Sequence, residues 1–95
     1  MKASYFGPMG YSQRHLFPAT WPIPPSYHDP ETSVQSYQEG MTECEFAEEM
    51  GFEHVWLVEH HFLAEFAHSS APEVTLAIMA ERTSKIRLGF GVVLT

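Results

Sequence analysis

The stretch from Gly51 to His61 constrains the fold more than any other part of the chain. Four consecutive apolar residues, Val55 to Val58, stand between that glycine and a Glu-His-His sequence. A run of this length has the size of one β-strand, and it is apolar at every position, which is typical of a strand covered on both faces in a parallel sheet. The sequence therefore predicts a strand at residues 54–59 whose carboxyl end releases three polar side chains.

The segment before this strand has a helical pattern. A helix is predicted at residues 32–50 because apolar residues recur at spacings of three and four: Val34, Tyr37, Met41, Cys44, Ala47 and Met50. Thr32 or Ser33 is expected to cap its start, and Gly51 to follow its end. Gly40 inside the helix costs about 1 kcal/mol relative to alanine, so it either permits close packing or is tolerated. Cys44 on the apolar stripe is interpreted as a core residue rather than a nucleophile.

The segment after the strand repeats the pattern. A second helix is predicted at residues 71–83, where Ser70 and Glu73 have the spacing of a capping box. This helix is apolar nearly all round, which indicates a largely buried helix. A strand is predicted at residues 86–94, and its two central glycines, Gly89 and Gly91, indicate a bulge or a place where another group approaches the backbone.

The amino-terminal part adds a first strand and a long connection. Residues 3–9 are predicted as a strand, and residues 10–30, with five prolines, as a long loop that is either a binding lid or mobile. The order β, α, β, α, β predicts an α/β fold with right-handed crossovers and a parallel sheet. Two helices cannot cover both faces of such a sheet, so residues 1–95 are expected to form the N-terminal part of a larger domain.

Composition excludes several classes of function. Five Lys and Arg against twelve Asp and Glu give a net charge of −7, and the few cations are scattered, so nucleic acid is not an expected partner. One cysteine excludes an internal disulfide and favours a cytoplasmic setting. No window is long and apolar enough to indicate a signal peptide or a membrane span, so no membrane partner is expected.

The chemistry is expected at the carboxyl end of the second strand, because sites in parallel α/β folds lie at that edge. Side chains alternate along a strand, so His60 should face away from Glu59 and His61. One imidazole can then serve the site as a proton donor or acceptor, and the other is structural. In the plainest interpretation both are satisfied loop histidines.

Other kinds of site are disfavoured by the absence of their motifs. The six histidines of the chain do not have the spacing of a zinc site, so no metal is predicted. The sequence also lacks the Gly-x-Ser-x-Gly elbow of many hydrolases. Gly-x-Gly-x-x-Gly and Walker loops are missing as well, which disfavours a classical nucleotide-binding fold.

Three motifs follow one another at short spacing: Gly51-Phe-Glu-His-Val-Trp-Leu-Val-Glu-His-His-Phe62, Ser70-Ala-Pro-Glu-Val74, and Ala80-Glu-Arg-Thr-Ser-Lys-Ile-Arg-Leu-Gly-Phe-Gly-Val-Val-Leu94. In this order they resemble the N-terminal third of the bacterial luciferase-like, flavin-dependent monooxygenases. The resemblance covers residues 32–95 closely and the proline-rich opening loosely. It implies a TIM (β/α)8 barrel, of which this chain would supply the first three strands.

The resemblance also implies roles for individual residues. His60, the first histidine of the Glu-His-His motif, would be the catalytic base and orienting group beside the flavin. The flavin ring would rest against a bulge in the third strand, so the implied cofactor-binding residues are Gly89, Phe90, Gly91 and Val92. The implied lining residues are Glu59, His61 and Phe62.

The implied reaction uses reduced FMN, supplied by a flavin reductase, to activate O2 and oxygenate a small organic substrate. An F420-dependent oxidoreductase is the alternative within the superfamily, and the Glu-His-His form favours FMN. Full-length members are expected to form homo- or hetero-oligomers, and this chain alone is expected to be inactive. The alternative from another class is a non-catalytic binding or assembly module that uses the open edge of its parallel sheet.

Overall fold

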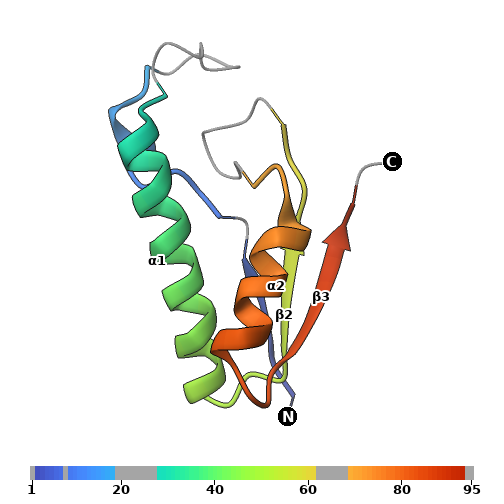
Figure 1. The fold of residues 1–95 in the computed structure, drawn as a ribbon. Helices are drawn as coiled ribbons and strands as arrows, with labels where there is room; N and C mark the ends of the chain where they lie inside the picture. The colour runs from blue at the N-terminus through green and yellow to red at the C-terminus, as the bar shows by residue number, and fades with distance from the viewer. Residues whose placement is uncertain (1, 8, 19–27, 62–68, 94–95) are drawn as a thin grey trace.

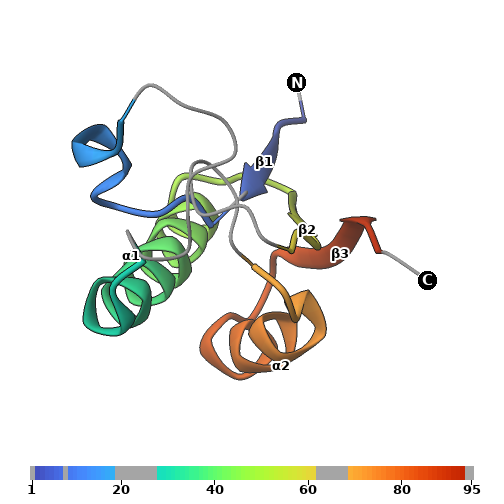
Figure 2. The same ribbon diagram turned by 90° about the horizontal axis from the view of Figure 1, so that it is seen from above.

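The computed structural model describes residues 2–7, 9–18, 28–61 and 69–93. Three strands, β1 (Ser4–Gly7), β2 (His54–Val58) and β3 (Arg87–Val92), form a parallel sheet in the order β1-β2-β3. Two helices, α1 (Pro30–Glu49) and α2 (Pro72–Arg82), connect them, and a short 3-10 helix, η1 (Arg14–Leu16), follows β1. Both α-helices lie on the same side of the sheet (Figures 1 and 2). The predicted α/β class and β-α-β-α-β order are confirmed.

The strands are shorter than predicted, and α1 begins earlier. Met9 has a φ of 53°, a left-handed conformation that cannot continue a strand, so β1 ends before it. Helix α1 begins at Pro30 because Asp29 is its cap: the Asp29 carboxylate accepts the N–H and the hydroxyl of Thr32, each at 2.8 Å. The predicted cap at Thr32 or Ser33 is therefore wrong. Gly51, with a φ of 84°, follows the helix end as predicted.

The predicted capping box at the start of α2 does not form. Ala71 is the cap residue, and its side chain makes no capping hydrogen bond. Pro72 is the first helical residue, so one of the amide groups that a cap would satisfy does not exist. The carbonyl of Ala71 accepts the N–H of Val74 at 3.1 Å, which begins the helical bonding.

The core lies between the sheet and the two helices. Val55 and Leu57 of β2 are completely buried, in one cluster with Cys44 and Ala47 of α1 and Met79 of α2. The buried position of Cys44 confirms its interpretation as a core residue, and burial raises the pKa of its thiol to about 11.

The opposite face of the sheet and one face of α2 are open. Trp56, between the buried Val55 and Leu57, is 37% exposed, so the expectation that β2 is covered on both faces is wrong for this chain. Val74 and Ile78 are 58% and 42% exposed, so α2 is not largely buried as predicted. The two helices that the structure describes pack on a single side of the sheet, which leaves its other face open (Figure 2).

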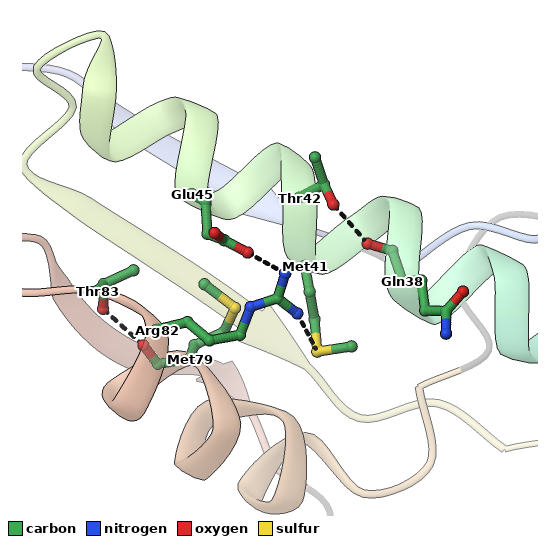
Figure 3. Close-up of polar contacts among 7 residues, drawn as sticks. All are labelled: Gln38, Met41, Thr42, Glu45, Met79, Arg82 and Thr83. Carbon is green, nitrogen blue, oxygen red and sulfur yellow. Dashed lines mark hydrogen bonds and ion pairs between the residues drawn. The ribbon is translucent and has the colours of Figure 1, made fainter.

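A polar contact joins the two helices on their outer side (Figure 3). The guanidinium of Arg82 pairs with the carboxylate of Glu45 and donates to Met41 Sδ at 3.7 Å. Exposed ion pairs of this kind contribute about 0.2–1 kcal/mol, so the contact orients the helices more than it stabilises them.

Gly40 permits close packing of α1 against the segment that follows β1. A Cβ atom at this position would lie 2.2 Å from Sδ of Met9, whose side chain is only 3% exposed. Of the two sequence-based interpretations of Gly40, the structure supports close packing.

Glu48 near the end of α1 binds the turn that leads into β3. Its carboxylate accepts the backbone N–H groups of Ser84, Lys85 and Ile86 at 3.0, 2.8 and 2.8 Å. The hydrogen bonds from Ile86 and Lys85 lower the pKa of Glu48, because they favour the charged form. One carboxylate thus holds α1 against the amino end of β3.

Replacing Glu48 by glutamine is expected to lower the urea midpoint of unfolding at neutral pH more than the same change at Glu49, its exposed neighbour on α1. The folded-state pKa lies below the unfolded value, so the stabilisation is present above about pH 4 and is lost as the pH falls through the folded-state pKa. The difference between Glu48→Gln and the native chain should therefore shrink in acid. A difference that stays constant with pH would contradict this account.

Candidate active site

The residues after β2 are anchored by backbone hydrogen bonds at the carboxyl edge of the sheet. The N–H of Glu59 donates to the carbonyl of Val92 at 3.1 Å, which extends the pairing with β3 beyond the strand itself. The N–H of His60 donates to the carbonyl of Ser69 at 2.8 Å. The Glu-His-His segment therefore has a fixed main chain, which is a requirement for orienting a catalytic side chain.

Glu59 and His61 lie together, as the alternation along a strand predicts. Nε2 of His61 lies 2.8 Å from Oε1 of Glu59, so these two groups are on the same side and His60 is outside their pair. The Glu59 side chain is 15% exposed and that of His61 is 43% exposed. His61 is paired with Glu59, and His60 is half-buried at the same edge.

The expected bulge in β3 is present. Leu57 is opposite Phe90, and the next residue of β2, Val58, is opposite Val92, so Gly91 is the extra residue. A Cβ atom at Gly91 would lie 3.2 Å from Cγ1 of Val58, tighter than most such contacts. The bulge lies next to the Glu-His-His segment, because Val92 accepts the hydrogen bond from Glu59.

Gly89 is explained by packing within the chain. It is opposite Trp56, and a Cβ atom there would lie 2.5 Å from Cζ3 of the indole ring. The ring also stacks on His54, with centroids 5.5 Å apart and planes 13° apart. The close approach that the sequence predicted at this glycine is that of Trp56.

The open face of the sheet carries large apolar side chains near the bulge. Phe6 is 57% exposed and Val92 54%. Phe90 is 45% exposed, but it is opposite the buried Leu57 and therefore belongs to the helix side of the sheet. Phe6 and Trp56 are paired in the register of β1 and β2, so they belong to one surface. Sequence reasoning did not assign Phe6, Trp56 or Ser69 to the site. The alternation along β2, which puts Trp56 on the face opposite Val55 and Leu57, was a sequence signal for Trp56, whereas none existed for Ser69.

The remaining expectations for the site are limited by the described residues. Phe62, predicted to line the site, lies outside them. Among the residues that are described, no three His, Cys, Asp or Glu side chains gather as metal ligands would. None of the described helices is both long enough and apolar enough to cross a membrane.

Comparison with known proteins adds an independent line of observation. Residues 17–95 match the model of the luciferase-like monooxygenase family. The N-acetyl-S-alkylcysteine monooxygenase of Bacillus subtilis (strain 168) is 43% identical over 61 residues, which are 64% of this chain and 18% of that protein. The 4-hydroxyprotoasukamycin monooxygenase of Streptomyces nodosus subsp. asukaensis is 46% identical over 50 residues, 53% of this chain and 13% of that protein.

The name of a third relative states that it depends on a flavin. The oxygenase component of the flavin-dependent trigonelline monooxygenase of Acinetobacter baylyi (strain ATCC 33305 / BD413 / ADP1) is 34% identical over 65 residues, 68% of this chain and 18% of that protein. The chain thus spans less than a fifth of the length of these three relatives. No solved structure matches the chain.

Proposed function

Because the chain belongs to the luciferase-like monooxygenase family, we propose that it supplies the first three strands and part of the active site of a flavin-dependent monooxygenase with a (β/α)8 barrel. The observation that supports this most directly is the hydrogen bond between Glu59 and Val92, which joins the Glu-His-His segment to the bulge at Gly91. The segment that carries His60 and the exposed backbone at Gly91 are thereby adjacent at the carboxyl edge of the sheet. Barrels of the α/β class have their active sites at this edge.

The residues at this edge fit a flavin. An isoalloxazine ring is flat and largely apolar, and the bulge offers it backbone at Gly91 with the exposed Val92 beside it. We propose that Gly91 and Val92 contact the ring, that Phe90 contributes through its backbone, and that Gly89 contributes by supporting Trp56. FMN is the proposed flavin, with the deazaflavin F420 as the disfavoured alternative. When FMN is bound in its reduced form, it supplies the activation of O2.

In this proposal His60 is the group that holds or moves a proton. Its main chain is fixed by Ser69, and an imidazole can both donate and accept a proton, which suits acid-base work. The pair formed by Glu59 and His61 orders the segment directly after β2. In this proposal the pair does not transfer protons to the substrate. The open apolar face around Phe6 and Trp56 would exclude water once it is covered.

The proposed substrate is a small organic molecule. The named relatives include monooxygenases of an N-acetyl-S-alkylcysteine and of 4-hydroxyprotoasukamycin, so the family match does not specify one compound. The relative from Acinetobacter baylyi is an oxygenase component, which supports a separate reductase as the source of reduced flavin. We propose such a reductase as the partner of the protein that contains this chain.

A chimera tests the proposed function. The 61 aligned residues of the N-acetyl-S-alkylcysteine monooxygenase would be replaced by those of this chain, and oxygenation of an N-acetyl-S-alkylcysteine would be measured with reduced FMN. The chimera is expected to retain flavin binding and measurable oxygenation. A chimera that folds and binds FMN but does not oxygenate would contradict the proposal.

A further inference from the structure

Ser69 is a buried polar residue beside His60. Its carbonyl oxygen accepts the His60 N–H at 2.8 Å, and the residue is 0% exposed. This hydrogen bond joins the two main chains directly, so the side chains of Ser69 and His60 start from adjacent backbone.

The hydroxyl of Ser69 makes no hydrogen bond in the structure. Within the described part of the chain, two buried side-chain oxygens lack one, and the other, Oε1 of Glu45, faces Arg82 in an ion pair. A buried hydroxyl that has lost its bonds to water without replacement costs free energy. Alanine at this position would avoid that cost, so stability does not explain why a serine is there.

We propose that Ser69 is a positioning residue for His60. Its carbonyl holds the main chain of His60, and its hydroxyl accepts the imidazole N–H when His60 holds a proton during the reaction. A protonated imidazole is a stronger donor than a neutral one, so the hydroxyl gains its partner in the working state. The inference rests on the proposed function of His60 and extends it to a second residue.

Histidine side-chain ¹H–¹⁵N spectra of the chain, recorded through a pH titration, test the contact directly. Ser69→Ala is expected to shift the His60 ring signals at the acid end and to leave those of His61 in place. Ser70→Ala is the matched control, because Ser70 is the exposed neighbour. His60 signals in Ser69→Ala that follow the native ones across the titration would overturn the inference.

Unfolding by urea supplies the second readout. If the Ser69 hydroxyl is bonded only when His60 is protonated, the urea midpoint of Ser69→Ala should be equal to or above that of the native chain. A lower midpoint would mean that the hydroxyl stabilises the fold, and it would overturn the inference. Ser69→Cys keeps the side-chain shape with a group that accepts hydrogen bonds only weakly, and it gives both readings if the alanine variant does not fold. Neither readout depends on oxygenation, so failure here is distinguishable from failure of the chimera.

Discussion

Replacing His60 by alanine in the chimera is expected to lower oxygenation about 10²- to 10⁴-fold, the usual contribution of a positioned acid-base group. Flavin affinity should remain nearly unchanged, because the proposed ring contacts are made by Gly91, Val92 and the backbone of Phe90. The main chain is fixed by the 2.8 Å hydrogen bond to Ser69 and needs no imidazole. Oxygenation rates with reduced FMN, together with quenching of flavin fluorescence, measure the two effects separately.

His61→Ala is the matched control for this prediction. The ring of His61 is held by Glu59 at 2.8 Å and is 43% exposed, so its removal should affect the rate far less than removal of His60. An equal loss in both variants would show that the wrong imidazole was assigned. Loss of flavin binding in His60→Ala would instead show that His60 contributes to the cofactor site and not to proton transfer.

The order of elements was predictable from the sequence because each has a strong local signal. The continuous apolar run from Val55 to Val58 indicates a strand, whereas apolar residues at spacings of three and four indicate the helix α1. The positive φ of Gly51 follows from its place directly after that helix. The start of α1 was harder, since Asp29, Thr32 and Ser33 can all act as caps. A proline directly after Asp29 is the signal that distinguishes it.

The site was predictable only in part, because much of it depends on register. Alternation along β2 placed Glu59 with His61, as the structure shows, whereas the opposite direction of the His60 ring stays a prediction. The bulge at Gly91 was expected from the glycines, but the contact between Gly89 and Trp56 requires knowing which residues of β2 and β3 are opposite each other. The unpaired hydroxyl of Ser69 has no local sequence signal at all.

Replacing Gly89 by alanine is expected to destabilise the chain, although alanine is ordinarily better than glycine inside a strand by about 0.5–1 kcal/mol. The new Cβ atom would lie 2.5 Å and 2.8 Å from two atoms of the rigid indole ring of Trp56, and overpacking of this kind costs about 1–3 kcal/mol. The overpacking term is the larger, so the urea midpoint should fall. The ring cannot turn aside without losing its stack on His54.

The same substitution made in a Trp56→Ala background distinguishes overpacking from loss of backbone freedom. With the indole removed, the added methyl group no longer meets the ring, so Gly89→Ala should become neutral or stabilising. This reversal of sign gives the pair a coupling free energy that a double-mutant cycle measures directly. A loss of the same size in both backgrounds would mean that Gly89 is required for its backbone conformation, and that its proposed support of the ring beside the flavin site is wrong.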